Sequence, residues 1–192
     1  MRFIRGAIGA SLIFCALLIQ INADSFDEWI VDSANQESDD EYTLLGIQPE
    51  ERWLVLPVSF ENHPISYEEV NDLLTGSQSA EVYIDAISAG KSNLEIDIQS
   101  VWTTSQNVKF WGEDINGERD YGSSGYGVEG LISELALDVL VDKDLSPWDL
   151  NSDGVIDRIL ILHSAPPQES GGSTNSLWSH FSLMNEDVEI GD

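Results

Sequence analysis

The sequence predicts a single α/β domain, because strand patterns and helix patterns alternate along the chain without any internal repeat. Its 192 residues, of which 42% are hydrophobic, are enough for one sizeable core. Aliphatic or alternating runs predict strands, and apolar residues at helical spacing predict helices. The expected strands are 52–60, 94–101 and 159–162, and the expected helices are 66–76, 79–91 and 126–143.

The first residues of the chain have the pattern of a secretory signal. Residues 1–5 carry two arginines, residues 6–19 are uncharged and apolar, and a polar stretch ends at the small residue Ala23. We therefore expect a signal peptide over 1–23 and a secreted, extracellular protein. An uncleaved membrane anchor is the alternative, although the apolar run is short for a bilayer span.

The remainder of the chain is strongly acidic. The formal net charge is -27, and residues 24–51 alone contain ten Asp or Glu, which predicts an exposed acidic leader or linker. Such a field repels nucleic acid and anionic lipid, so we expect neither nucleic acid nor, after signal cleavage, a membrane as a partner. The only cysteine, Cys15, lies in the signal, so no disulfide is expected in the mature chain.

The first predicted strand, 52–60, contains Pro57, which cannot donate a hydrogen bond and places the strand at a sheet edge or at a bulge. The helix that follows should begin at Ser66, which forms a capping box with Glu69, and should end at Gly76. Val70, Leu73 and Leu74 share one face of this helix, and we expect that face to pack.

The next elements are a short helix and a strand. In the helix 79–91, Tyr83, Ala86 and Ile87 lie on one side, and Gly90 ends it. Segment 94–101 alternates apolar and polar residues, which is typical of a strand with one face in solvent. Residues 103–125 contain many turn formers, including Asn116-Gly117, and predict a long loop or irregular hairpin.

The last helix and strand are the most apolar parts of the domain. Helix 126–143 is apolar almost all round, which predicts deep packing. The aliphatic run 159–162 predicts a central strand that is covered on both faces.

A loop rich in oxygen donors immediately precedes this final strand. In "DLNSDGVID", side chains that carry oxygen stand at positions 1, 3, 5 and 9, with Gly154 at position 6. This spacing resembles that of calcium-binding loops, in which a backbone carbonyl at position 7 completes the set. Position 12 is Leu160 instead of Glu, and a strand follows instead of a helix. The predicted calcium ligands are Asp149, Asn151, Asp153, Val155 through its carbonyl, and Asp157.

The alternative is a turn built by Asp and Asn side chains that starts the strand without any metal. We favour metal binding because three carboxylates in so short a loop repel one another unless a cation screens them. A calcium ion would then join the end of the long helix to the start of the strand.

Residues 146–183 resemble immune inhibitor A-type secreted zinc metallopeptidases. The shared pattern is an aspartate-rich loop, a strand that ends in a His, a Gly-rich loop, and then Trp178-Ser179-His180. Residues 83–102 and Tyr121-Gly122 resemble earlier parts of that family's domain. The resemblance implies a zincin-like α/β fold with a mixed sheet and packed helices, secretion, and hydrolysis of protein or peptide substrates.

The catalytic motif of such enzymes is absent from residues 1–192. A zincin places His-Glu-x-x-His on a helix to bind zinc, whereas this chain has only His63, His163 and His180, none of them four residues from another. We expect 52–192 to be the incomplete N-terminal part of a metallopeptidase domain, with no catalytic residue and with Zn²⁺ bound only by a downstream part. The alternative is a stand-alone secreted calcium-binding module with a structural or interaction role.

Two further sets of side chains are expected to be structural. His163 should close its strand with its ring satisfied, and His180 should order a loop, so neither is a predicted zinc ligand. The polar run 113–120 could hold a second cation, but a solvated hairpin tip is the favoured interpretation.

Overall fold

The computed structural model describes residues 45–179 and 188–190. The predicted signal peptide, the leader up to residue 44 and His180 lie outside these residues, so those predictions remain open. The chain divides into two units between Gln48 and Pro49. Of the first unit the structure describes only residues 45–48, where the Gln48 side-chain amide donates to the Gly46 carbonyl. The second unit contains the sheet and its helices.

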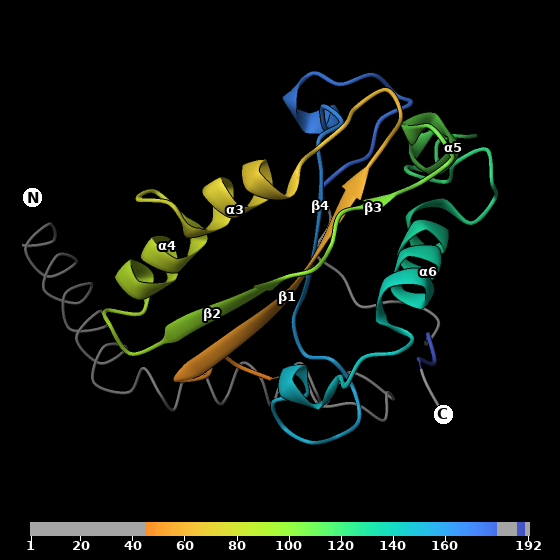
Figure 1. Cartoon of the computed structure of the whole chain (residues 1–192). Helices are drawn as coiled ribbons and strands as arrows, with labels where there is room; N and C mark the ends of the chain where they lie inside the picture. Colours follow the sequence, from red (N-terminus) through yellow and green to blue (C-terminus); the bar gives the residue numbers. More distant parts are fainter. Residues whose placement is uncertain (1–44, 180–187, 191–192) are drawn as a thin grey trace, which may run out of the picture. The chain divides into compact units, whose positions relative to one another are not determined.

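The second unit is built on a four-stranded parallel sheet with β1 (Glu50–Ser59) in the middle (Figure 1). Leu54 and Val55 pair with both β2 (Asn93–Ile98) and β4 (Ile159–His163), so these strands flank β1 on opposite sides. The short β3 (Trp102–Thr103) continues the β2 side. The α/β class is therefore confirmed. Pairing among these four strands is parallel throughout, so the mixed sheet that we expected is not found within the described residues.

Pro57 lies in this central strand and not at an edge, so the edge interpretation was wrong. The amide of Leu54 donates to Arg158 on the β4 side, and alternation along the strand turns the Pro57 nitrogen toward the β2 side. There, Ile98 pairs with Val55 and Trp102 pairs with Val58. The β2–β3 path thus has one more residue than β1 over this step, and it bulges where Pro57 has no N–H to offer.

Helices cover both faces of the sheet (Figure 1). On one face, Val55 packs against Val70 and Leu74 of α3 (Tyr67–Thr75), which is followed by α4 (Ala80–Ile87). On the other face lie α5 (Val108–Gly112) and α6 (Gly127–Leu140). The larger core on this second face is built from side chains of β1, α5, α6 and the loops around them. Its fully buried members include Leu54, Leu56, Val58, Trp111, Leu131, Leu135 and Leu140.

The predicted start of the first helix is confirmed in detail. The Ser66 hydroxyl oxygen accepts from the Glu69 amide at 3.2 Å, and the Glu69 carboxylate accepts from the Ser66 amide at 2.8 Å. Helix α3 ends at Thr75, directly before Gly76. Its buried face is narrower than expected, since Leu73 is 60% exposed while Val70 and Leu74 are buried.

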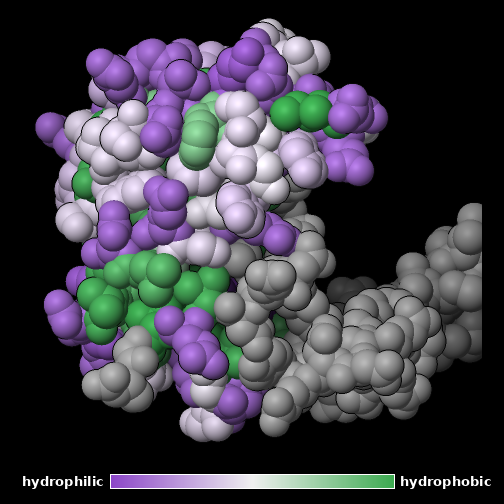
Figure 2. Space-filling model, turned by 90° about the vertical axis from the view of Figure 1, so that its right-hand side faces the viewer, coloured by the Kyte–Doolittle hydropathy of each residue, from purple (hydrophilic) through white to green (hydrophobic). Residues whose placement is uncertain are grey.

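Helices α4 and α6 each bury only one side, so the packing expected around the whole of α6 was partly wrong. In α4 the buried side chain is Ile84, while Tyr83 and Ile87 face outward. In α6, Leu137 is 47% exposed and Val141, just after the helix, is 50% exposed. Figure 2 shows apolar side chains gathered on the α6 side of the molecule. The sheet and the neighbouring loops contact only one side of each helix, so an apolar residue on the opposite side stays in solvent.

The strand β4 also differs from its prediction. It pairs only with β1 among the described residues, so it is an edge and not a central strand. Its residues are half-buried or exposed, with Ile159 at 43% exposure. Alternation still holds, because Leu160 and Leu162 pack with α3 while Ile161 packs on the α6 side.

The segment 103–125 is more ordered than the long loop that we expected. It contains the end of β3 and helix α5, whose N-cap residue Asn107 accepts a hydrogen bond from the Phe110 amide. The predicted Asn116-Gly117 turn is confirmed. Both of its residues have positive φ, 56° and 91°, and an antiparallel bridge joins Ile115 to Glu118 across it.

Candidate metal-binding loop at the entry to β4

The loop 149–157 connects a short 3₁₀ helix, η1 (Ser146–Trp148), to β4 at the amino-terminal end of the sheet (Figure 1). The chain reaches it from the end of α6 through a short polar segment. Both ends of the loop are fixed to the sheet, so its side chains have defined directions.

Trp148 fixes the beginning of the loop. Its side chain is 8% exposed, and its indole N–H donates to the Asp97 carboxylate of β2 at 3.0 Å. The Trp148 carbonyl accepts from the amide of Asp157 at 3.0 Å, which closes the loop. Trp148 therefore joins the first and last turns of the loop and attaches them to a strand on the far side of β1.

Arg158 fixes the end of the loop. Its Nε lies 3.3 Å from Oε2 of Glu51, whose side chain is only 4% exposed. We had assigned Glu50 and Glu51 to the exposed leader, and this was wrong, because β1 begins at Glu50 and Glu51 is buried beneath Arg158. A buried carboxylate needs a cationic partner, and Arg158, which directly follows the loop, supplies one. The sequence shows Arg158 directly after the loop, but it does not show that Glu51 is its partner.

Within the loop, the polar side chains turn toward backbone amides. Asp149 accepts from the amides of Asp153 at 3.1 Å and Gly154 at 2.9 Å. The Asn151 side-chain oxygen accepts from the same Asp153 amide at 3.1 Å, and its NH₂ group donates to the Asp153 carboxylate at 2.9 Å. Ser152 and Gly154 have positive φ, 63° and 91°, which coils the chain tightly enough for these contacts.

Asp157 is the most electrostatically unusual carboxylate of the loop. It accepts from the Leu150 amide at 2.6 Å. The pKa of Asp157 is nevertheless raised above 3.8, chiefly because partial burial disfavours its charged form. The Leu150 hydrogen bond and the Arg158 charge oppose this rise, whereas the charges of Asp153 and Asp149 add to it. The carboxylates of the loop therefore repel one another, as the spacing predicted.

Four of the five predicted ligands thus turn their side-chain oxygens into one short loop. The fifth, Val155, donates its amide to Asp153 at 3.0 Å. Among residues 45–179 and 188–190, no group of three or more His, Cys, Asp or Glu is placed so as to hold a metal ion together. Two predicted ligands, the Asn151 side chain and the Val155 carbonyl, are not of these residue types. The carboxylate oxygens of Asp149 and Asp157 accept hydrogen bonds from backbone amides of the loop.

The opposite end of the sheet holds His163, at the carboxyl end of β4. Its ring lies edge-on to Phe60, with centroids 6.1 Å apart. Burial lowers the pKa of His163, while a backbone contact with Ala165 and the charges of Glu169 and Asp120 raise it by smaller amounts. We expected a satisfied ring, but the buried Nδ1 has no hydrogen-bond partner in the described part of the chain.

Near His163, two carboxylates from the run 113–120 hold the loop that follows β4. Asp120 is 3% exposed and accepts from the Trp178 amide at 3.0 Å, and Asp114 accepts from the Gln168 side chain at 3.0 Å. Arg119 stacks over the Trp178 ring at 4.1 Å. Asp114 and Asp120 are thus not part of a solvated tip, because the tertiary fold brings residues 168–178 against them, whereas residues 116–119 are exposed as we favoured.

Comparison with known proteins identifies no family for this chain, so its function must be argued from its own residues. No protein-family model matches the chain, and no curated protein matches it. Every helix in the described ranges is too short or too polar to cross a bilayer.

Proposed function

We propose that the loop 149–157 binds Ca²⁺ and that the domain is the N-terminal portion of a secreted, zincin-like zinc metallopeptidase. The observation that carries the calcium proposal is the inward turn of Asp149, Asn151, Asp153 and Asp157 within a loop anchored at both ends. The peptidase proposal is supported by the resemblance of 146–183 to that family and by an α/β domain of the expected class.

The chemistry of the donors selects the ion. The loop offers carboxylate, amide and backbone carbonyl oxygens and contains no His or Cys, which suits a hard cation such as Ca²⁺ better than Zn²⁺. When bound, Ca²⁺ supplies positive charge among carboxylates that otherwise repel one another. Arg158, which directly follows the loop, is already paired with Glu51, so it does not neutralise the loop by itself.

The role that follows is structural. Neutralising the loop stabilises the connection between α6 and β4, which places the carboxyl end of β4 and the segment after it. Residues 1–192 contain no His-Glu-x-x-His, so we expect the purified chain to hydrolyse no peptide even with added zinc. Zinc-dependent cleavage that is abolished by a chelator would contradict this. A stand-alone calcium-binding module remains the alternative, and an in-frame His-Glu-x-x-His downstream in the gene would exclude it.

Calcium titration of the purified chain tests the loop. At a hundredfold excess of free ion over Kd, binding to the folded state alone adds about 2.7 kcal/mol to the free energy of unfolding. Asp153→Asn keeps the size of the side chain and one acceptor oxygen but removes its charge, and it should lose most of this gain. Asp142→Asn removes the same charge from an exposed position outside the loop and should keep it.

Thermal unfolding and calorimetry together distinguish a specific Ca²⁺ site in this loop from the alternatives. An unchanged thermal midpoint in excess Ca²⁺ would overturn the calcium proposal. An equal gain in Asp153→Asn and in the wild-type chain would overturn the choice of this loop. A gain from Mg²⁺ as large as that from Ca²⁺ would show general screening of the acidic surface instead of a specific site.

A further inference from the structure

The outer face of α4 carries an apolar stripe that the fold leaves uncovered. Val82 is 51% exposed, Tyr83 63% and Ile87 54%, and Ala86 is also exposed. Residues four apart lie on the same side of a helix, so 82 and 86 stand next to 83 and 87. Ile84 is the buried residue of the helix. Single exposed apolar residues are ordinary, but a contiguous group of this kind marks an interaction surface.

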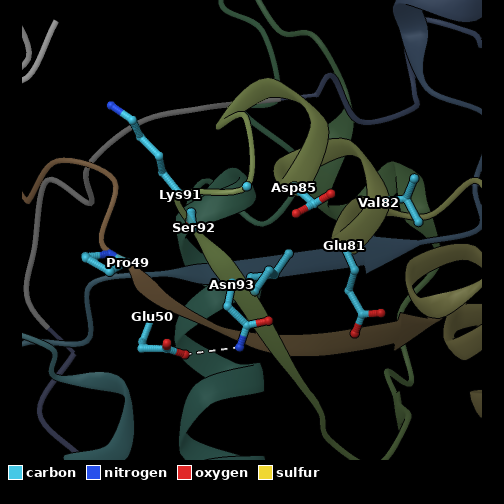
Figure 3. A pocket seen from close by; sticks show the side chains of 10 residues that line it. Pro49, Glu50, Glu81, Val82, Asp85, Lys91, Ser92 and Asn93 are labelled. Carbon is cyan, nitrogen blue, oxygen red and sulfur yellow. Dashed lines mark hydrogen bonds between the residues drawn. The ribbon is translucent and has the colours of Figure 1, made fainter.

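An acidic cleft adjoins this stripe. The cleft has a volume of about 680 Å³ and lies between α4, the turn that follows it, and the first residues of β1 and β2. Glu81 and Asp85 of α4 line it, together with Glu50 and one cationic residue, Lys91, and Figure 3 shows the carboxylates of Glu81 and Asp85. Glu50 accepts a hydrogen bond from Asn93 at 3.1 Å. The Lys91 side chain extends away from these two carboxylates (Figure 3).

The whole α3–α4 surface has one sign of charge. Neither helix contains a Lys or Arg, and together they carry five carboxylates. The side chains of Glu81 and Asp85 form no hydrogen bond or ion pair with any described residue. A cationic group that approaches Glu81 and Asp85 would therefore meet two carboxylates for which no described residue competes. The five are Glu68, Glu69, Asp72, Glu81 and Asp85.

We propose that the outer face of α4 is a docking surface for a basic amphipathic segment of a partner protein. The apolar residues of that segment pack on Val82, Tyr83 and Ile87. Its Lys or Arg side chains pair with Glu81 and Asp85 at the mouth of the cleft. This is the helix-in-groove mode of recognition, in which spaced apolar anchors give affinity and flanking charges give orientation.

Charge decides against a second copy of this chain as the occupant. Two α4 helices related by a twofold axis would bring Glu81 and Asp85 of both copies together, and each chain has a formal net charge of -27. The exposed pair Leu137 and Val141 near the end of α6 does not line this cleft. It therefore serves as a matched control surface.

A synthetic helical peptide with Leu on one face and Lys on the other is the probe, and calorimetry with the full chain is the measurement. We expect the double variant Tyr83→Ser with Ile87→Ser to weaken binding at least about tenfold, which is about 1.4 kcal/mol. The double variant Glu81→Gln with Asp85→Asn should weaken it to a similar degree. All four positions are solvent-exposed or half-exposed, so unchanged thermal midpoints are expected.

The control variants replace two exposed apolar residues, or two carboxylates, elsewhere on the surface. Leu137→Ser with Val141→Ser, and Glu134→Gln with Asp142→Asn, should each change affinity by less than about twofold. A peptide with Glu in place of Lys should not bind. Equal losses in the control pairs would show non-specific attraction and overturn the proposal, as would binding that is insensitive to the α4 variants. Self-association of the chain that Tyr83→Ser with Ile87→Ser abolishes would make a second copy the occupant and would equally overturn it.

Discussion

The Nε of Arg158 lies 3.3 Å from Oε2 of Glu51, so the residue that enters β4 is paired with a buried carboxylate near the beginning of β1. Leu54 and Arg158 are also joined through their backbones at 3.0 Å. The loop 149–157 is thus attached to the central strand at its end and, through Trp148, to β2 at its beginning. These attachments fix both ends of the loop to the sheet, while Ser152, Asp153 and Gly154 between them remain exposed.

We predict that Glu51→Gln lowers the free energy of unfolding by about 1–3 kcal/mol, because it leaves the charge of Arg158 without its partner. Arg158 is 26% exposed at its side chain, so water relieves part of the cost. Urea denaturation measures the change. Glu95→Gln is the matched control, since Glu95 pairs with Arg52 on the same sheet but is 57% exposed and should cost much less. Equal losses would contradict a special role for the buried pair.

We predict that Asp157→Asn changes the pH dependence of stability in cation-free buffer. The pKa of Asp157 is raised in the fold, so its contribution to stability is present at low pH and is lost as pH rises through that raised value. The thermal midpoint of the wild-type chain should therefore rise relative to that of Asp157→Asn as the pH is lowered toward 3.8. With Ca²⁺ present the trend should reverse, because protons compete with the ion. If the thermal midpoints of the two chains depend on pH in the same way without Ca²⁺, the raised pKa of Asp157 would be refuted.

We predict the opposite trend for His163. Burial lowers its pKa below 6.5, so the stability it contributes is present above 6.5 and is lost as pH falls through its lowered value. Relative to His163→Gln, the wild-type chain should lose thermal stability on mild acidification. Asp120, Glu169 and His63 are the charged or titratable groups that act on the ring. An acid dependence that survives unchanged in His163→Gln would place the titrating group elsewhere.

Gly127→Ala should destabilise the fold more than Gly117→Ala does. Both glycines have positive φ, so both substitutions incur left-handed strain of roughly 1–2 kcal/mol. At Gly127 a Cβ would also lie 2.1 Å from the Asp120 carbonyl oxygen, whereas at Gly117 it would meet nothing within 4 Å. Thermal unfolding of the two variants compares them directly. Similar midpoints would mean that the Asp120 segment can move aside.

Leu135→Ala and Leu137→Ala test which face of α6 packs. Leu135 is fully buried and Leu137 is 47% exposed. The first substitution should cost about 2–5 kcal/mol of unfolding free energy. The second should change it by less than about 0.5 kcal/mol. A large loss from Leu137→Ala would indicate that its face is covered in solution.

Local interactions explain why some features could be predicted from the sequence. The capping box of Ser66 and Glu69, the Asn116-Gly117 turn and the alternation of β2 depend on residues close together in the chain. The same is true of the loop 149–157, where Asp149 reaches amides only four and five residues away. Chemistry at such short range is already specified by the order of residue types.

The remaining features depend on which segments meet. Nothing near Pro57 in the sequence reveals that β2 bulges opposite it, and nothing near Glu51 announces that a residue 107 positions later neutralises it. Leu73 and Leu137 were expected to pack, because hydrophobicity shows that a side chain can be buried but not whether another segment covers it. The sequence by itself determined the α/β class, the helix start and the donor set of the loop. Only the tertiary structure decided which faces are covered and which charges are paired, because burial and ion pairing are properties of contacts between distant segments.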